Sequence, residues 1–398
     1  MRNERNPYKL SDVVQFNPAE RLSKGAIAKK VAMEHLQPFT RAISGYELAV
    51  YSGGSKFRNG DTLMARITPC LENGKTAYVS FLDNGEVGFG STEYIVFRSI
   101  EGVTDSKFVY YFVTSPWFRN IAIKSMVGSS GRQRVQQSVL ENLEVNIPPL
   151  EEQKRIAAIL GSLDDKIELN RRINANLEEQ AQALFKSWFV DFEPFRDGPF
   201  VDSELGKIPQ GWKVGDIYTY LDVIYGAPYK SALFNTDKKG YPLIRIRDLK
   251  TFLPQFYTEE ILPNTEYVDS GDIVAGMDAE FVPYIWKGER GLLNQRVCKF
   301  MPKYDYVSKY YILSLIRPTL EFVQSYKVGT TVSHLGKSDI DKFKVIIPPA
   351  EIVKRFSGIV DSFHQQIIKL AKENLNLSAL CDTLLPKLMA GEINVENQ

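Results

Sequence analysis

The sequence predicts an α+β fold: two strand-rich globular domains joined by two long helices packed as an antiparallel coiled coil, with an internal pseudo-two-fold repeat. Three observations predict this fold. Apolar residues recur at heptad spacing, that stretch recurs 200 residues later, and a strand-rich region precedes each copy. The expected segments are a first globular domain (1–146), a first helical segment (147–192), a linker (193–211), a second globular domain (212–346) and a second helical segment (347–398).

The first helical segment begins at a pair of prolines, Pro148 and Pro149. Such a pair cannot continue a strand but can start a helix, and the acidic Glu151 and Glu152 then suit the positive end of the helix dipole. Apolar residues follow at alternating spacings of four and three, which predicts a coiled-coil seam. The seam positions are Ile156, Leu160, Leu163, Ile167, Asn170, Asn174, Leu177, Ala181, Leu184 and Trp188.

The second helical segment repeats this pattern after Pro348 and Pro349, and its Asn374 aligns with Asn174. Each helix could pack only on its own globular domain, but the shared register favours packing of the two helices on each other. A polar pair in an apolar seam fixes the alignment at a cost in stability. Pro386 is expected to kink this helix, so that Leu388 leaves the seam. The second set of seam positions is Phe356, Val360, Phe363, Ile367, Leu370, Asn374, Leu377, Cys381, Leu384 and Leu388.

The two globular domains also align. In the first, strands are expected at 78–82, 93–97 and 143–147, with a short aromatic helix at 108–119 and a small-residue loop at 128–134. The second domain replays the first from Trp212 onward but has diverged further than the helices. Diverged domains on a duplicated scaffold indicate two related binding tasks on different targets; the alternative is plain drift after duplication, with one domain inert.

The length of the helices suggests a spacer. From 156 to 188 an α-helix would measure about 50 Å at about 1.5 Å per residue. An antiparallel pair would hold the two domains at opposite ends, which suits a duplex target with two half-sites. The linker of about 20 residues, rich in glycine and proline, permits a parallel pair too, so the antiparallel arrangement is a hypothesis.

Composition adds little. The net charge is +1, although residues 1–146 carry 18 Lys/Arg against 14 Asp/Glu. Widely separated cysteines predict a reduced, cytoplasmic protein, and no apolar stretch predicts secretion or a membrane span. No Cys/His group has zinc spacing, so no metal site is expected. The residues concerned are Cys70, Cys298, Cys381, His35, His334 and His364.

Catalytic motifs are missing. Gly74-Lys75-Thr76 and Gly336-Lys337-Ser338 end like phosphate-binding loops, but Pro69 and Thr331 stand where the first glycine is required. The sequence contains no G-x-S-x-G, no H-E-x-x-H and no Pro-Pro-aromatic motif of an amino-methyltransferase. We therefore expect no enzymatic activity and no cofactor in this chain.

The chain resembles the specificity subunits of type I restriction–modification systems. The resemblance covers essentially the whole sequence, and departs from the pattern where Glu351-Ile352-Val353 replaces Glu151-Glu152-Gln153. The runs that carry it are 146–157 (NIPPLEEQKRIA), 184–192 (LFKSWFVDF), 205–212 (LGKIPQGW), 384–393 (LLPKLMAGEI) and 61–75 (DTLMARITPCLENGK).

The resemblance implies that each globular domain is a target-recognition domain reading one half of a split, asymmetric site in double-stranded DNA. It implies that the helices set the gap and dock modification (methyltransferase) subunits, two of them, and that restriction subunits complete the enzyme. S-adenosylmethionine, ATP and Mg²⁺ would belong to those partners. The alternatives are a stand-alone DNA methyltransferase or endonuclease, and a coiled-coil adaptor whose domains bind proteins.

Candidate DNA-binding residues come from loop position and residue type, because Arg and Gln bond base edges while Lys and Ser more often contact phosphates. In the first domain they are Lys56, Arg58, Arg66, Lys124, Arg132, Gln133 and Arg134. In the second they are Tyr229, Lys230, Arg245, Arg247, Lys327, Ser333, His334 and Lys337. Candidates on the helix surface for contact with modification subunits are Lys166, Arg171, Arg172, Glu178 and Glu179.

Overall fold

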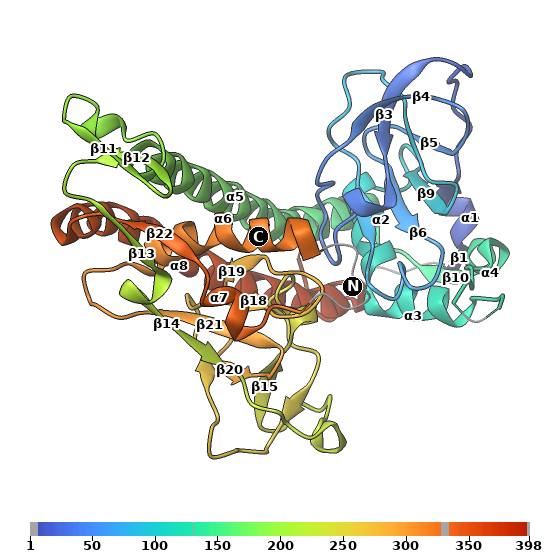
Figure 1. The fold of residues 1–398 in the computed structure, drawn as a ribbon. Coiled ribbons are helices and arrows are strands. Elements are labelled where there is room, and N and C mark those ends of the chain that lie inside the picture. The colour runs from blue at the N-terminus through green and yellow to red at the C-terminus, as the bar shows by residue number, and fades with distance from the viewer. Residues whose placement is uncertain (1–6, 130, 328–333, 396–398) are drawn as a thin grey trace. The chain divides into compact units, whose positions relative to one another are not determined.

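The computed structural model describes residues 7–129, 131–327 and 334–395. They form two compact units, unit 1 (Met1–Glu168 with Asn376–Gln398) and unit 2 (Leu169–Leu375). Unit 1 holds a globular head, head 1 (7–146), and unit 2 holds head 2 (212–346) (Figure 1).

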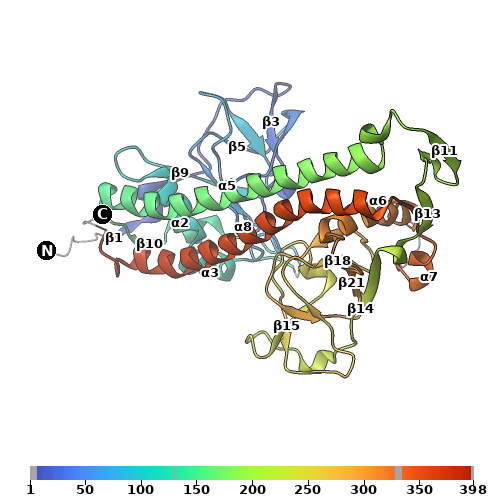
Figure 2. The same cartoon turned by 90° about the vertical axis from the view of Figure 1, so that its left-hand side faces the viewer.

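A long helix follows each head in the sequence: α5 (Leu150–Phe189) follows head 1 and α8 (Ala350–Ala390) follows head 2. Each starts directly after a proline pair, as expected. Each also begins in one unit and ends in the other, so every unit contains half of both helices. Within each unit the two halves lie side by side (Figure 2).

The direction of the pair follows from the cores. In unit 1, Ile156 near the start of α5 shares a core with Leu388 near the end of α8. In unit 2, Phe189 at the end of α5 shares a core with Phe356 near the start of α8. The start of each helix therefore meets the end of the other, and the antiparallel arrangement is confirmed.

Most predicted seam positions face these cores. The buried ones are Ile156, Leu160, Ile167, Asn170, Asn174, Ala181, Phe356, Val360, Ile367, Leu370 and Leu388. The partly buried ones are Leu163, Leu177, Leu184, Trp188, Phe363, Asn374, Leu377, Cys381 and Leu384. Toward its end α5 buries Phe185 and Phe189, one residue beyond the predicted Leu184 and Trp188. An α-helix has about 3.6 residues per turn, so its buried face drifts away from a 3.5-residue repeat.

The asparagine pair in the seam differs from the alignment. Asn170, not Asn174, donates from its Nδ2 to Asn374 Oδ1 (2.9 Å), and also to Glu373 Oε2 (2.9 Å). Asn174 Nδ2 donates to the carbonyl oxygen of Ile367 (3.3 Å). Residues that align in a repeat do not face each other in an antiparallel pair, which explains the exchange.

Leucine substitutions at the two asparagines should separate their roles. The Oδ1 atoms of both asparagines are buried with no hydrogen-bond partner among the described residues. Among these residues the Asn174 side chain donates only one hydrogen bond, at 3.3 Å, so Asn174→Leu should keep or raise the melting temperature. Asn170→Leu removes the donor to two acceptors and should lower stability by about 1–3 kcal/mol. Thermal denaturation of both variants tests this. A large drop for Asn174→Leu, equal to that of Asn170→Leu, would contradict the assignment.

The expectation that Leu388 leaves the seam after Pro386 was wrong. α8 continues through this proline to Ala390, and Leu388 is only 1% exposed in the core of unit 1. A proline inside a helix removes one N–H donor and crowds the carbonyl of residue i−4, at a cost of about 3 kcal/mol or more. Burial of Leu388 and Val395 in the core of unit 1, at about 1.5–3 kcal/mol for each side chain, offsets this cost. The apolar core therefore retains the last turn of the helix.

Head 1 consists of two four-stranded sheets, with strand orders β2-β9-β6-β7 and β4-β3-β8-β5, and a closing pair β1-β10. The strands are β1 (Pro7–Lys9), β2 (Val14–Phe16), β3 (Ile27–Val31), β4 (Glu47–Val50), β5 (Ser55–Phe57), β6 (Thr62–Ala65), β7 (Thr76–Tyr78), β8 (Gly88–Gly90), β9 (Tyr94–Ser99) and β10 (Glu144–Asn146). The helices are α1 (Leu10–Val13), η1 (Met33–His35), α2 (Ser106–Thr114), α3 (Pro116–Lys124) and α4 (Gln137–Glu141).

Head 2 repeats this topology. Its sheets have the orders β14-β21-β18-β19 and β16-β15-β20-β17, with β13-β22 as the closing pair. The strands are β13 (Lys213–Asp216), β14 (Leu221–Tyr225), β15 (Tyr241–Ile244), β16 (Tyr257–Thr258), β17 (Tyr267–Val268), β18 (Ile273–Gly276), β19 (Pro283–Ile285), β20 (Gly291–Leu293), β21 (Val297–Pro302) and β22 (Lys344–Ile347). The helices are η3 (Ile217–Thr219), η4 (Ser231–Leu233), η5 (Ile246–Asp248), α6 (Lys309–Lys327) and α7 (Lys337–Ile340).

The repeat extends to strand direction. β3 pairs with β8 in parallel, and the equivalent β15 and β20 are also parallel, whereas the other pairs within the four-stranded sheets of the described chain are antiparallel. Matching order and matching direction in both heads confirm the internal repeat.

Three segments differ from the sequence-based expectation. The strand expected at 78–82 lies earlier, as β7 (Thr76–Tyr78), and residues 79–82 are outside any strand. The aromatic helix expected at 108–119 is two helices, because Ser115 caps α3 through the backbone N–H of Phe118 (3.3 Å) and Pro116 occupies its first turn. The glycine- and proline-rich segment 193–211 contains a short helix, η2 (Glu193–Phe195), and a hairpin of β11 (Phe200–Ser203) and β12 (Gly206–Pro209). It is therefore a folded segment rather than an open linker.

Each head contacts a long helix closely, through polar groups in unit 1 and through a tight glycine turn in unit 2. In unit 1, Arg41 forms an ion pair with Asp165 of α5, and Tyr111 donates to Asp164 (2.6 Å). In unit 2, a tight turn meets α8: Gly271 has a φ of +94°, and a Cβ atom there would lie 2.4 Å from the Cδ1 atom of Ile368.

Candidate nucleic-acid interface

The predicted small-residue loop of head 1 follows α3 and is closed by backbone pairing. The Val127 N–H donates to the Arg134 carbonyl (3.0 Å), and the Arg134 N–H donates to the Val127 carbonyl (2.9 Å). Gly128 has a φ of +134°, and a Cβ atom there would lie 2.9 Å from the carbonyl oxygen of Arg132. The tight turn therefore requires glycine and places Arg132 near the tip.

The same loop is tied to the segment after β6. The Thr68 N–H donates to the Gln133 carbonyl (3.0 Å), and Ile67 forms an isolated bridge with Arg134. Arg66 lies beside this junction and donates from Nη2 to the Val135 carbonyl (3.1 Å), while its Nε is buried with no partner among the described residues. Arg66 thus holds the end of the loop through the Val135 carbonyl, and its Nε–H has no acceptor among the described residues.

The two arginines of the loop are not equivalent. Arg134 donates from Nε (2.9 Å) and Nη2 (2.6 Å) to Glu93 Oε1, an ion pair that neutralises its charge. Arg132 is exposed and has no ion-pair partner among the described residues. Arg132 is therefore the loop residue best placed to contact a ligand, and Arg134 fixes the loop to the strand side of the head.

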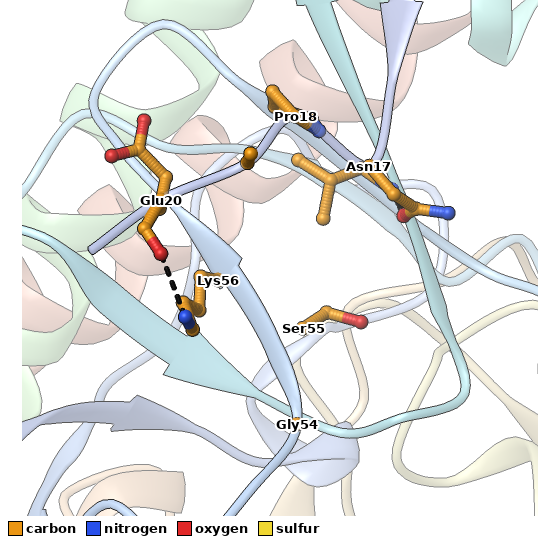
Figure 3. Close-up of a pocket in the computed structure, with 8 residues that line it drawn as sticks. Asn17, Pro18, Glu20, Gly54, Ser55 and Lys56 are labelled. Atoms are coloured by element: carbon orange, nitrogen blue, oxygen red, sulfur yellow. Dashed lines mark hydrogen bonds between the residues drawn. The ribbon is translucent and has the colours of Figure 1, made fainter. Parts of the chain in front are cut away.

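Lys56 and Arg58 belong to a polar cluster around Glu20. Glu20 takes Arg58 Nη2 and Arg98 Nη1 on its carboxylate (2.6 Å each), and Lys56 Nζ donates to the Glu20 carbonyl (2.6 Å). Arg98 also holds Asp61 (2.7 Å), whose pKa is raised by burial. Lys56 and Glu20 line a cleft of about 290 Å³. Figure 3 shows the two residues joined by their hydrogen bond. Both predicted residues are thus engaged within head 1.

Two further positions on α3 bear on the interface. Lys124 is exposed in the last turn of the helix. Arg119 was missed by the sequence reasoning: it is half-buried, and its Nη2 donates to the carbonyl oxygen of Glu72 (3.1 Å). A single arginine in a short, otherwise mostly apolar helix is a signal that could have indicated it.

In head 2 the predicted residues are dispersed. The Tyr229 ring is buried in a small core, where its hydroxyl donates to Thr265 Oγ1 (3.1 Å), so it does not lie on the surface. Lys230 and Arg247 are exposed. Arg245 is partly covered: its guanidinium pairs with Asp248 (3.3 Å) and lies 4.3 Å from the centre of the Phe256 ring.

The remaining predicted residues of head 2 that the structure describes, between α6 and α7, are linked by ion pairs. Lys327 Nζ lies 2.6 Å from both Asp339 Oδ2 and the His334 carbonyl oxygen. His334 Nδ1 lies 2.6 Å from Asp278 Oδ1, and Lys337 pairs with Asp341 at 2.8 Å. Ser333 lies outside the described residues. The places of these side chains in the heads do not test whether they contact DNA. The DNA contacts assigned to both heads therefore stay predictions.

Comparison with known proteins finds the same family domain in both halves of the repeat. A profile of the family described as "Type I restriction modification DNA specificity domain" matches residues 3–179 and 209–377. The chain belongs to this type I specificity family.

No helix in the described parts of the chain is long and apolar enough to cross a membrane, and those parts contain no group of three His, Cys, Asp or Glu that could hold a metal ion.

Several relatives within the type I specificity family are similar over most of their length. The MjaIX specificity subunit of Methanocaldococcus jannaschii is 32% identical over 75% of this chain and 72% of its own. The HindI specificity subunit of Haemophilus influenzae is 27% identical over 84% and 87%. The crystal structure of a type I restriction–modification S subunit from M. genitalium has the same fold, with a TM-score of 0.50 at 15% identity, covering 96% of this chain and 95% of that one.

The family domain thus occurs twice in this chain. Each profile match covers one head and runs into the helix that follows it, α5 or α8.

Proposed function

We propose that this specificity subunit reads a split, asymmetric DNA site, with head 1 reading one half and head 2 the other. The observation that carries the proposal is the repetition of one head topology with different side chains at the equivalent loops. A shared topology supports the same mode of binding in both heads, and different side chains support different base sequences.

In this proposal the two long helices act as spacer and as docking surface. α5 and α8 set the gap between the half-sites and dock two modification subunits, and restriction subunits complete the enzyme. The chain itself catalyses no reaction. S-adenosylmethionine, ATP and Mg²⁺ are bound by the partner subunits, which act with this chain on DNA in the cytoplasm. The antiparallel seam, with its polar contacts at Asn170 and Asn174, supports a helix pair of one defined register.

A map of methylated bases in the host genome tests the proposal. The map is recorded with the gene present, deleted and restored. Loss of one split, asymmetric methylated motif on deletion, and its return on restoration, is the expected result. If the modification subunits co-purify with this chain and are active, yet the map does not change on deletion, the proposal is wrong.

Within this function, Arg132→Ala should have the larger effect of the two loop arginines. Loss of a base contact costs about 1–3 kcal/mol, so affinity for the cognate site should fall about 10- to 100-fold and base preference should relax in one half-site. Arg134→Ala should weaken binding less, because Glu93 already neutralises Arg134. Titrations at fixed salt, with DNA altered in either half, measure both effects. Unchanged affinity and preference for Arg132→Ala would rule out this contact.

A further inference from the structure

An exposed aromatic ring stands in the loop after η1. Phe39 is 65% exposed, and its backbone adopts a left-handed conformation with a φ of +51°. Head 2 has the same turn: Phe252 also follows the equivalent short helix η5 by four residues and has a φ of +59°. There, however, the ring packs on Trp286, with 5.8 Å between ring centres. The turn belongs to the common fold, whereas the open ring is particular to head 1.

The Phe39 ring is held in place from one side. The Phe39 N–H donates to the Gly74 carbonyl (3.0 Å), and a Cβ atom at Gly74 would lie only 2.5 Å from the ring. Glycine at 74, with a φ of +71°, thus lets the ring lie flat on the backbone. The ring is held in one position while much of its surface faces solvent.

A guanidinium lies over the same ring. Arg119 Cζ is 4.8 Å from the centre of the Phe39 ring, and the only hydrogen bond of the Arg119 side chain among the described residues runs from Nη2 to the carbonyl oxygen of Glu72. No carboxylate in the described parts of the chain pairs with it, its Nε has no partner there, and burial lowers its pKa below the ordinary value. A partly buried positive charge without a counter-ion favours an anion brought by a ligand.

Arg119 and Phe39 lie next to the small-residue loop (128–134). The segment 68–74 joins the two: Thr68 N–H donates to the Gln133 carbonyl of the loop, and Thr68 Oγ1 donates to Glu72 Oε1 (3.0 Å). The carbonyl oxygens of Glu72 and Gly74 in turn accept hydrogen bonds from Arg119 Nη2 and from the Phe39 N–H. An unpaired arginine and an exposed ring are therefore anchored on the same short segment as the loop that presents Arg132.

We propose that Arg119 and Phe39 form a backbone contact to the DNA of the first half-site. Arg119 takes a phosphate oxygen, and Phe39 packs against the adjoining sugar and base. The inference rests on the proposed function and extends it from base reading by the loop to a sequence-independent contact that positions the duplex. Arg is suited to this role because its planar guanidinium both stacks on an aromatic ring and bonds phosphate.

The test measures DNA affinity against salt for the complex of this chain with its modification subunits. Each phosphate contact contributes about 0.9 to the slope of log affinity against log salt. Arg119→Gln should lower that slope by about 1 and weaken binding by roughly three- to tenfold at physiological salt, equally on the cognate site and on DNA altered in the first half-site. Arg119→Lys should restore the slope, because it keeps the charge. Phe39→Ala should weaken binding without changing the slope.

Lys30→Gln is the matched control, since it removes one positive charge from the same head at a residue already paired with Glu47 (2.6 Å). It should leave slope and affinity unchanged. An unaltered slope for Arg119→Gln, with a wild-type melting temperature, overturns the proposal while sequence-specific binding by the wild-type complex upholds the proposed function. A slope that falls equally in Arg119→Gln and Lys30→Gln also overturns it. A wild-type complex that binds all DNA alike refutes the proposed function itself.

Discussion

Replacing Phe356 by alanine should destabilise unit 2 by about 3–5 kcal/mol, the usual cost of removing a buried aromatic ring. The Phe356 side chain is fully buried near the start of α8. Its ring centre lies 5.0 Å from that of Phe189 and 5.9 Å from those of Phe185 and Tyr311. The ring thus fills the point where α8, α5 and α6 meet, and its loss leaves a cavity common to all three.

Urea denaturation followed by tryptophan fluorescence measures this change through the transition midpoint, provided that the slope of the transition stays constant. Phe322→Ala is the matched control, because Phe322 lies in the same unit but is 68% exposed. It should shift the free energy of unfolding by less than about 1 kcal/mol. Similar shifts for both variants would mean that the aromatic cluster does not hold α8 on head 2.

Acidification should destabilise unit 2 through His364. This imidazole is buried between α8 and head 2 and lies 3.0 Å, through Nε2, from the carbonyl oxygen of Gly271. Burial lowers the pKa of His364 from its ordinary value of 6.5 to about 4, so the folded protein keeps it neutral. In the unfolded chain the group takes up a proton as the pH falls below about 6.5.

The sign follows from proton uptake: between pH 6.5 and 4 the unfolded state binds more protons, so stability falls as the pH falls. The contribution of His364 is fully present above about pH 6.5, and about 3 kcal/mol of it is lost by pH 4. His364→Gln cannot titrate but keeps a donor for Gly271. Denaturant unfolding of both proteins across this window should show a difference in stability that shrinks toward acid pH. A difference that is constant with pH would contradict the assignment.

The helices could be predicted from the sequence because the apolar period and the proline pairs report local geometry. The antiparallel direction was a hypothesis at that stage, because the linker permits a parallel pair too, and the shared cores confirm it. The partner of Asn374 could not be predicted in this way, since alignment pairs it with Asn174 whereas space pairs it with Asn170. A repeat shows which residues are equivalent, and only packing shows which are opposite.

The candidate interface was less predictable. Residue type and loop position indicated Arg132, but not that Arg134 is neutralised by Glu93, 41 residues away in sequence. Burial of Tyr229 likewise depends on strands that meet only in the folded head. For Arg119 the sequence offers only a lone arginine in a short, mostly apolar helix; that no carboxylate among the described residues pairs with it is seen only in the folded head. Ion pairing across strands decides which charges are available, and it is a tertiary property.

The division of both helices between the units has a consequence for synthesis. The core of unit 1 joins Ile156 and Leu160 to Leu388 and Val395, near the other end of the chain. During translation, the apolar face of the first helix therefore emerges long before the residues that cover it. The core of unit 1 can be completed only after some 200 further residues have been synthesised, whereas the core of unit 2 can be completed before that. Such a delayed closure leaves a transiently exposed apolar surface, which is where nascent chains recruit chaperones or aggregate.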